Sequence, residues 1–253
     1  MMSGAIIVLV FLVTFGLFLS EAESVDEIEP ITYDDDYIID KFVGGLERPI
    51  AMTFVGDDIL VLEKDTGKVF LIEYNGIFHN QPVLDVPVES AYDSGLLGIS
   101  SISNHVFLYF TESESGFDNS EIQYIPLKNK VYRYDWNGEN LINPILIKEL
   151  PGENWSNLHN GGVMTKGLNN EIYFAIGDLF HHGIFQNVIS SNNVVETGIF
   201  KIDTEENNKV ELFAMGIRNS FGLAVDPQSG YLWDTENGPD NFDEINLVEP
   251  GFN

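Results

Sequence analysis

Three polar clusters in the second half of the chain contain residue types that can carry out chemistry. The first surrounds His159, in the run Leu158-His-Asn-Gly-Gly162, ahead of a strand-like segment that ends in Gly177-Asp178. Imidazole exchanges a proton near neutral pH, so a histidine in such a place can act as a general base. We expect His159 to be accessible because it lies in a loop. The competing interpretation is an imidazole that only caps a turn.

The second cluster is Gly216-Ile-Arg-Asn-Ser220, in which Arg218 is one of only 12 Lys and Arg residues in the chain. A planar guanidinium followed by an amide, Asn219, can hold an anionic or carbonyl ligand through several directed hydrogen bonds. The competing interpretation is a structural ion pair between Arg218 and one of the many carboxylates.

The third cluster is the acidic stretch from Glu236 to Asn246, which is dense in oxygen donors. Gly238 and Pro239 bend the backbone so that carbonyl groups can point outward. Calcium takes six to eight oxygen ligands from carboxylates, carbonyls and water, whereas the thiolate and imidazole ligands preferred by zinc are absent from the stretch. An acidic turn that is merely solvated is the alternative.

The composition excludes several classes of function. Asp and Glu number 40 against 12 Lys and Arg, which gives a formal charge of -28. Nucleic acid is therefore an unfavourable partner, and so is an anionic membrane surface. The absence of cysteine excludes disulfides and cysteine nucleophiles, while 44% hydrophobic residues are enough for a buried core.

The N-terminus has the composition of an export signal. Residues 1–22 contain an apolar run, Ala5 to Leu19, followed by the small residues Ser20 and Ala22, although no Lys or Arg precedes the run. We expect a signal peptide or a retained N-terminal anchor, and hence a protein outside the cytoplasm, secreted or held on the outer face of the membrane. Residues 23–40 are predicted to be a flexible acidic leader, and residues 41–253 the folded domain.

Short runs rich in β-branched and aromatic residues recur between turn signals, and no segment sustains an apolar stripe at helical spacing. The fold class is therefore predicted to be all-β. The strand candidates are Ile59–Leu62, Val69–Ile72, Val106–Phe110, Val131–Tyr134, Ile172–Ile176, Gly198–Ile202 and Tyr231–Trp233.

Four segments share one layout, in which a small or apolar stretch is followed by a turn and a strong strand. Their strong strands begin near Ile59, Val106, Ile172 and Tyr231, at intervals of about 47, 66 and 59 residues. Such intervals are typical of β-propeller blades with loop insertions, so about four blades are predicted. A β-sandwich with similar hairpins is the alternative. The four segments are Ala51–Glu63, Gly95–Thr111, Gly161–Gly177 and Gly222–Thr235.

The three clusters, in their order along the chain, resemble the soluble quinoprotein glucose and sorbosone dehydrogenase family. Members of that family are six-bladed propellers that use pyrroloquinoline quinone and calcium, and the resemblance covers most of residues 41–253. It is carried by Gly45-Leu-Glu-Arg-Pro49, Gly95-Leu-Leu-Gly98, His159-Asn-Gly-Gly162, Gly177-Asp178, Gly216-Ile-Arg-Asn219 and Glu236-Asn-Gly-Pro239.

The resemblance implies that the protein oxidises an aldose by hydride transfer to the quinone and passes electrons to an external acceptor. His159 would be the base, and Asp178 would orient its imidazole. Arg218 and Asn219 would hold the quinone oxygens, and Arg218 would stabilise the charge that develops there.

The resemblance also implies two roles for calcium. The backbone carbonyls of Gly238 and Pro239 would hold the ion that polarises the cofactor. Asp243 and Glu244 match carboxylates that are associated with a structural calcium in the family.

The chain departs from the family pattern at several positions. Asp93 replaces a glutamine, Val163 and Met164 replace an arginine and a leucine, and Ser220 replaces a proline. These changes bear on activity more than on fold. Two other functions therefore stay open: a calcium-stabilised binding propeller without catalysis, and a calcium-dependent sugar lactonase.

Where the chain ends at Asn253, the family continues into about two further blades. The resemblance therefore implies an N-terminal fragment. Activity is expected of the full-length protein rather than of these 253 residues alone.

Overall fold

The structure is a computed structural model that describes residues 31–34, 36–122, 127–152, 157–182 and 197–252. It divides into two units, Met1–Lys41 and Phe42–Asn253. The predicted signal peptide or anchor, residues 1–22, lies outside the described residues, as do residues 23–30 and 35 of the predicted leader. Among the described residues, no helix has the length and apolar character needed to cross a membrane.

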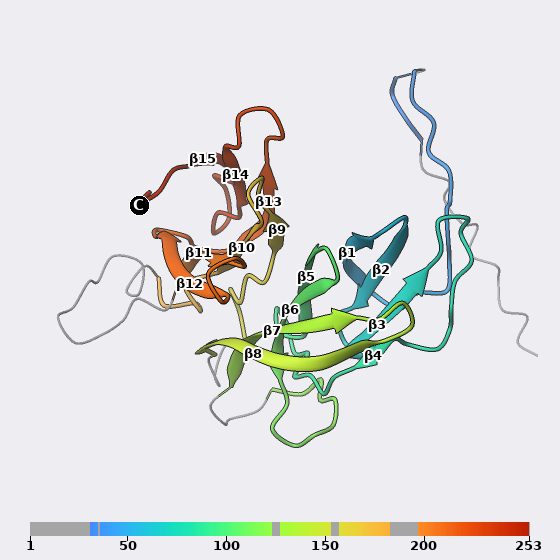
Figure 1. Cartoon of the computed structure of the whole chain (residues 1–253). Coiled ribbons are helices and arrows are strands. Elements are labelled where there is room, and N and C mark those ends of the chain that lie inside the picture. Colours follow the sequence, from blue (N-terminus) through green and yellow to red (C-terminus); the bar gives the residue numbers. More distant parts are fainter. Residues whose placement is uncertain (1–30, 35, 123–126, 153–156, 183–196, 253) are drawn as a thin grey trace, which may run out of the picture. The chain divides into compact units, whose positions relative to one another are not determined.

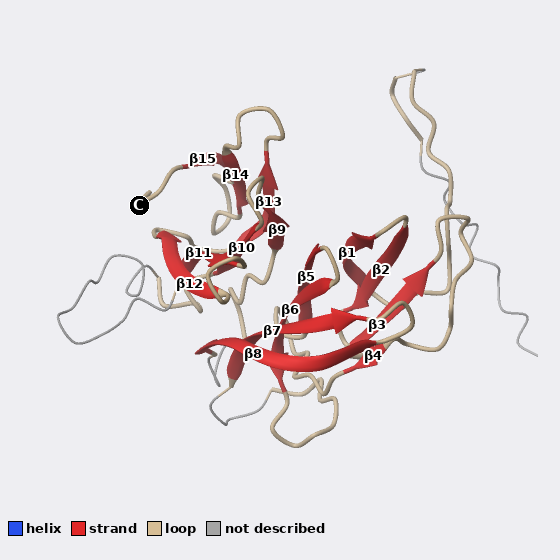
Figure 2. Cartoon of the chain, viewed as in Figure 1, coloured by secondary structure: helices blue, strands red, loops and turns tan. Residues whose placement is uncertain are grey.

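The described part of Phe42–Asn253 is built from β-strands and contains no α-helix (Figure 2). The strands are β1 (Pro49–Val55), β2 (Asp58–Glu63), β3 (Lys68–Ile72), β4 (Leu84–Asp85), β5 (Leu96–Ile102), β6 (His105–Glu112), β7 (Lys128–Trp136), β8 (Leu141–Pro151), β9 (Met164–Lys166), β10 (Glu171–Ile176), β11 (Gly198–Asp203), β12 (Lys209–Ala214), β13 (Ser220–Val225), β14 (Leu232–Glu236) and β15 (Glu244–Val248).

The strands form four antiparallel sheets, in each of which neighbours in sequence are neighbours in space (Figure 1). The sheets are β1 to β4, β5 to β8, β9 to β12 and β13 to β15. The first strands of successive sheets pack in order, β1 on β5, β5 on β9 and β9 on β13. This is the arrangement of propeller blades around a central channel. The predicted all-β propeller with four blades is confirmed, and the sandwich alternative is wrong.

Strands such as β6 and β10, which have a blade on each side, are buried on both faces. In β6, Val106, Leu108 and Phe110 pack in a core with residues of the first blade, whereas Phe107 and Tyr109 pack in a core with residues of the third. All five are essentially buried. A strand that is covered on both faces reads as a continuous apolar run instead of an alternating one.

Each pair of neighbouring blades encloses its own hydrophobic core. The first core joins β2 and β3 to β5 and β6, the second joins β6 and β7 to β10 and β11, and the third joins β10 and β11 to β14 and β15. The backbones of the second and third blades also approach each other closely. A Cβ atom on Gly98 of β5 would lie 1.9 Å from the carbonyl oxygen of Gly162, so only glycine fits there.

One buried carboxylate interrupts this apolar packing. Asp234 on β14 has no exposed surface, and burial raises its pKa, an effect that Ser220 and Asn246 only partly offset. When folding raises the pKa of a carboxyl group, the folded protein loses stability as the pH rises from the unfolded pKa through the folded pKa. We therefore expect Asp234→Asn to raise the thermal unfolding midpoint at pH 7, by about 2–4 °C per kcal/mol recovered. The gain should vanish below about pH 3.9, where an unfolded aspartate is also protonated.

Asp226, in the turn between β13 and β14, is the matched control. Its carboxylate accepts hydrogen bonds from the Gln228 amide and the Ser229 hydroxyl, both at 2.8 Å, and these bonds lower its pKa. Asp226→Asn should therefore lower the midpoint at pH 7, and the loss should disappear as the pH falls. Thermal melts of both variants between pH 3 and 8 measure this. A pH-independent loss in Asp234→Asn would contradict the argument.

Candidate active site

The predicted site residues lie in loops at one end of the blades. Asp93, His159 and Arg218 lie in the loops that enter the innermost strands β5, β9 and β13, and Asp178 and Gly238 follow the second strands β10 and β14. In an antiparallel pair, the start of one strand and the end of the next lie at the same edge of the sheet. The blade topology therefore brings residues far apart in sequence to a common rim.

His159 and Asp178 form a buried pair at this rim. His159 Nδ1 lies 2.5 Å from Asp178 Oδ1, and the two side chains are 8% and 3% exposed. Asp178 Oδ1 also accepts a hydrogen bond from the Phe180 backbone amide at 3.0 Å. A carboxylate at Nδ1 fixes the ring orientation and favours the tautomer in which Nδ1 carries the proton, which leaves Nε2 as the basic nitrogen.

The expectation that His159 would be accessible is wrong, because the residue is only 6% exposed. Its backbone has a φ of 58°, an uncommon value outside glycine, and its amide donates a 2.8 Å hydrogen bond to Asp93 Oδ2. The Phe180 ring packs edge-on against the imidazole, with the ring centroids 5.4 Å apart. The loop therefore turns the imidazole inward, toward Asp178.

The first two clusters meet at Gly177. A Cβ atom on this residue would lie 2.4 Å from the carbonyl oxygens of both His159 and Arg218. The next amide, that of Asp178, donates a hydrogen bond to the Arg218 carbonyl at 2.8 Å. The histidine loop, the aspartate and the Arg-Asn pair are thus in direct backbone contact, although about 60 residues separate His159 from Arg218.

Arg218 joins the second cluster to the third. Its guanidinium donates to the carbonyl oxygen of Asn237 at 2.7 Å, and its backbone amide donates to the Glu236 carboxylate. The Asn237 amide in turn donates to the carbonyl of Asn219 at 3.1 Å. Burial raises the pKa of Glu236, and the Arg218 amide opposes this rise. Among the described residues, the Arg218 guanidinium pairs with the Asn237 carbonyl and forms no ion pair with a carboxylate. The competing interpretation of a structural ion pair is therefore not supported there.

Two buried amide side chains near the rim lack hydrogen-bond partners among the described residues. Asn219 is 4% exposed with its Oδ1 unpaired, and Asn157 is 1% exposed with both side-chain polar atoms unpaired. Buried polar groups in proteins are nearly always hydrogen-bonded, because an unpaired one costs about 1–3 kcal/mol. The two amides therefore indicate that a ligand or ordered water completes this region.

The third cluster forms a tight exposed turn. The Gly238 amide donates to Asp243 Oδ1 at 2.9 Å, and both Asp243 and Glu244 are exposed. The part of the chain that the structure describes contains no group of three His, Asp or Glu side chains close enough to bind a metal ion together. The structure therefore brings Gly238 next to Asp243 but gathers no carboxylate cage around Gly238 and Pro239.

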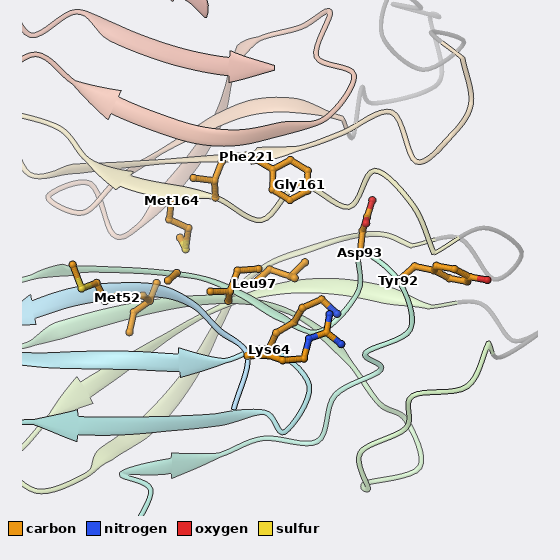
Figure 3. Close-up of a pocket in the computed structure, with 13 residues that line it drawn as sticks. Met52, Lys64, Tyr92, Asp93, Leu97, Gly161, Met164 and Phe221 are labelled. Carbon is orange, nitrogen blue, oxygen red and sulfur yellow. The ribbon is translucent and has the colours of Figure 1, made fainter. Parts of the chain in front are cut away.

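The innermost strands surround a cavity of about 440 Å³, called here the central cavity (Figure 3). Each blade contributes at least one apolar side chain to its wall, among them Met52 from β1, Leu97 from β5, Met164 from β9 and Phe221 from β13. Asp93 lines it next to the histidine loop. Its volume and mixed lining are typical of a small-molecule site.

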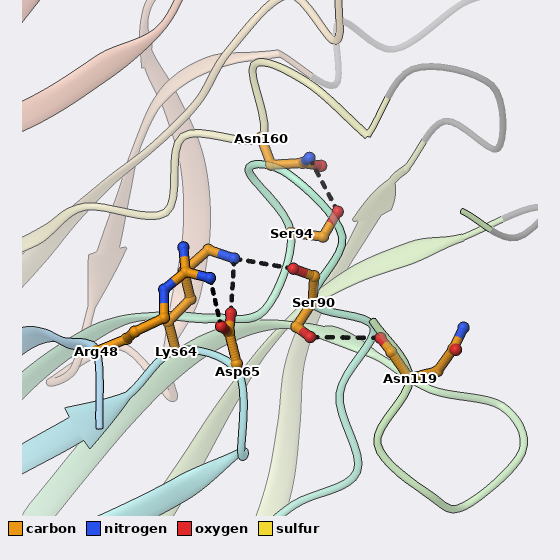
Figure 4. Close-up of polar contacts among 7 residues, drawn as sticks. All are labelled: Arg48, Lys64, Asp65, Ser90, Ser94, Asn119 and Asn160. Atoms are coloured by element: carbon orange, nitrogen blue, oxygen red, sulfur yellow. Dashed lines mark hydrogen bonds and ion pairs between the residues drawn. The ribbon is translucent and has the colours of Figure 1, made fainter. Parts of the chain in front are cut away.

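Sequence reasoning missed a buried polar network that supports the histidine loop. Asn129 on β7 accepts from the Thr111 hydroxyl at 2.7 Å and donates to Asn160 Oδ1 at 2.8 Å. Asn160 Nδ2 contacts the Ser94 hydroxyl at 3.3 Å (Figure 4), and the Tyr109 hydroxyl donates to the Asn160 carbonyl at 2.9 Å. Asn129 was the available signal, since an asparagine inside a buried strand needs polar partners.

Tyr109→Phe tests this network. Burial raises the pKa of Tyr109 well above its ordinary value, so the hydroxyl remains a donor throughout the neutral range. Its loss leaves the buried carbonyl of Asn160 short of one partner, and we expect the free energy of unfolding to fall by about 1–3 kcal/mol. Urea unfolding measures the change. Tyr132→Phe is the control, because that hydroxyl makes a longer, part-buried contact of 3.2 Å to Glu112. Equal losses in both variants would contradict the prediction.

Comparison with known protein families identifies the family of the chain. Residues 46–253 match the sequence model of Glucose / Sorbosone dehydrogenase. The chain belongs to the glucose/sorbosone dehydrogenase family. The expected resemblance is thereby confirmed, and the matched region includes all four blades and every rim residue described above.

Two curated relatives are informative within this family. Quinoprotein glucose dehydrogenase B of Acinetobacter calcoaceticus is 26% identical over 247 residues, which cover 83% of this chain and 50% of the relative. The aldose sugar dehydrogenase YliI of Escherichia coli is 43% identical over 49 residues, 19% of this chain and 13% of the relative. The chain thus spans about half the length of the first of these two relatives.

Solved structures of the family share the fold. An oxidoreductase of Thermus thermophilus, described as a glucose dehydrogenase, is 27% identical with a TM-score of 0.68, over 83% of this chain and 64% of that one. The aldose sugar dehydrogenase of Streptomyces coelicolor in its form bound to pyrroloquinoline quinone is 24% identical with a TM-score of 0.65, over 85% of this chain and 64% of that one.

Proposed function

We propose that the full-length protein oxidises an aldose sugar with pyrroloquinoline quinone as its cofactor. The observation that carries the proposal is the buried His159–Asp178 pair, held against the Arg218 backbone at Gly177, in a chain of the glucose/sorbosone dehydrogenase family. A base with an orienting carboxylate can remove the hydroxyl proton of an alcohol as hydride leaves its carbon, and a guanidinium at the same rim can stabilise the charge that develops on the acceptor.

In this proposal His159 acts through Nε2, since Nδ1 faces Asp178. Nε2 accepts the proton of the anomeric hydroxyl while the hydrogen on the same carbon leaves as hydride, and the aldose becomes a lactone. Asp178 stabilises the imidazolium that forms, in the way an aspartate supports a catalytic histidine in other enzymes. The quinone, when bound, supplies the two-electron acceptor for the hydride.

The residues present fit a planar, anionic quinone. The central cavity of about 440 Å³ offers apolar walls for a ring system, and Arg218 and Asn219 lie in the loop beside Phe221 of its wall. The Asn219 Nδ2 would be the donor to a quinone oxygen, whereas its unpaired Oδ1 is an acceptor and would take an N–H or O–H group of the ligand or of water. Arg218 and Asn219 would hold the quinone oxygens. A guanidinium also provides local positive charge, which a tricarboxylate needs in a chain of charge -28.

The described residues fit calcium at one of the two expected positions only. Asp243 and Glu244 are exposed, and Asp243 is already engaged by the Gly238 amide, so a structural calcium at these two side chains lacks a preformed cage. A calcium ion held by the carbonyls of Gly238 and Pro239 would draw its remaining oxygen ligands from the cofactor and water. We keep that carbonyl site as the proposal.

The test is a dye-reduction assay of the full-length protein reconstituted with the quinone and calcium. Aldose-dependent reduction that requires both additions supports the proposal. Hydrolysis of sugar lactones without quinone would favour the lactonase instead, and calcium-dependent stabilisation without turnover would favour a binding propeller. We also propose a location outside the cytoplasm, for which the apolar run near the N-terminus is the support. Cell fractionation tests the location.

A further inference from the structure

Two cations from the first blade line the central cavity and have no role in the function proposed above. Arg48 directly precedes β1 and Lys64 directly follows β2, the same positions in the first blade that Asn219 and Asn237 occupy in the fourth. Both line the cavity, together with Asp93. Figure 3 labels Lys64 and Asp93 at the wall.

Lys64 is held rigidly. Its side chain is 9% exposed, and its ammonium lies 3.0 Å from Asp65 Oδ1 and donates to the Ser90 carbonyl at 3.0 Å (Figure 4). Its own carbonyl accepts the Leu96 amide at 2.9 Å, and a Cβ on Gly95 would lie 2.5 Å from that carbonyl. An ammonium has three donors, so one remains for a ligand.

Among the described residues, the Arg48 side chain is held by one partner. Its Nη1 lies 2.6 Å from Asp65 Oδ2, while 68% of the side chain is exposed. Asp65 thus bridges both cations (Figure 4). A guanidinium carries five N–H donors in a fixed fork, and four of them are not used by Asp65. The pair therefore has donors to spare at the edge of the cavity.

The cavity wall lacks the acidic excess of the chain. Acidic residues outnumber basic ones 40 to 12 overall, whereas the charged residues lining the cavity are two cations, Arg48 and Lys64, and one anion, Asp93. Asp65, behind them, neutralises one of the two positive charges. Asp93 is itself engaged by the backbone amide of His159. The cations therefore offset the carboxylate that replaces the family glutamine.

We propose that Arg48 and Lys64 form a carboxylate-binding subsite on the first-blade wall of the central cavity. The proposal rests on the proposed function, because a ligand held by Arg218 on the fourth-blade side would extend its other edge across the cavity. The carboxylate belongs either to the quinone cofactor or to an acidic sugar. In both cases the guanidinium fork and the remaining ammonium donor make charge-assisted hydrogen bonds to it.

The test measures binding by calorimetry, with the full-length protein, calcium and constant ionic strength. The variants are Arg48→Gln and, as the matched loss of one positive charge, Lys209→Gln, an exposed lysine on β12 paired with Glu206 and Glu211. If the carboxylate is that of the cofactor, Arg48→Gln weakens binding of pyrroloquinoline quinone about tenfold, whereas its trimethyl ester binds to variant and wild type alike. Lys209→Gln should change neither affinity more than about twofold.

The sugar source is distinguished by kinetics. If the carboxylate is that of the sugar, Arg48→Gln leaves quinone binding unchanged and raises KM for galacturonate about tenfold but not KM for galactose. If the wild type binds quinone and oxidises sugars while Arg48→Gln changes none of these quantities, the subsite is wrong and the proposed function stands. A wild type that binds no quinone and oxidises no sugar overturns both proposals. Thermal melts of Arg48→Gln verify that the fold is intact.

Discussion

Replacing His159 by asparagine is expected to lower kcat for aldose oxidation by about 10²–10⁴-fold, the usual contribution of a positioned general base. Asparagine is smaller than histidine, but its amide can still donate to Asp178, and it cannot accept a proton at neutral pH. His159 Nδ1 lies 2.5 Å from Asp178 Oδ1 and both side chains are buried, so the imidazole is the group that Asp178 orients. Dye reduction by the reconstituted full-length protein measures the loss.

His105→Asn is the control, because His105 also pairs with an aspartate. Its Nδ1 lies 3.0 Å from Asp135 Oδ1, but its side chain is 43% exposed on β6, away from the rim. That variant should keep full activity. Quinone affinity should be unchanged in both variants, since neither histidine is proposed to hold the cofactor. Full sugar oxidation by His159→Asn would show that the base has been assigned to the wrong residue.

Gly177→Ala is expected to have the second largest effect. The added Cβ would lie 2.4 Å from the carbonyls of His159 and Arg218, so the two backbones must separate. Overpacking of this kind typically costs about 1–3 kcal/mol of unfolding free energy. We expect kcat to fall by more than the loss of folded protein accounts for, because the separation moves His159 away from Arg218. Urea unfolding and the dye assay, on the same preparation, measure both.

Gly167→Ala provides a matched substitution between β9 and β10 of the same blade. Its Cβ would approach only the Glu171 side chain, with 2.4 Å to Cδ and 2.5 Å to Cγ, and that exposed end can move if it gives up its hydrogen bond from the Asn169 amide. Stability should therefore fall less than in Gly177→Ala, and activity should change little. If Gly177→Ala were as stable and as active as the wild type, the close backbone contact between the histidine loop and Arg218 would not exist in solution.

The strands that could be predicted from sequence are those with continuous apolar runs, and they include β2, β3 and β14 of the end blades as well as strands enclosed by two blades. Ile172–Ile176 in β10, like Val106–Phe110 in β6, is apolar on both faces because cores lie on both sides of it. The innermost strands were recognised only as small or apolar stretches. One of them, β9, has three residues, too few to show a period. The outermost strand β8 has mostly exposed residues and no apolar face to recognise.

The site residues could be selected by type and order, but their contacts could not. The meeting of His159 with Asp178 follows from blade topology, since one precedes β9 and the other follows β10. The burial of His159 depends on a φ of 58° and on Asp93, 66 residues earlier, neither of which has a local sequence signal. From the sequence, Asp93 is only a departure from the family pattern, whereas in the structure its carboxylate accepts a hydrogen bond from the His159 amide and holds the histidine loop.

A crystal structure of the full-length protein with pyrroloquinoline quinone and calcium tests the central claim most directly. The account predicts the quinone in the central cavity, with its oxygens within hydrogen-bond distance of Arg218 and with His159 Nε2 facing the space above the ring. A quinone bound elsewhere on the protein, with the imidazole of His159 turned away from it, would contradict the account.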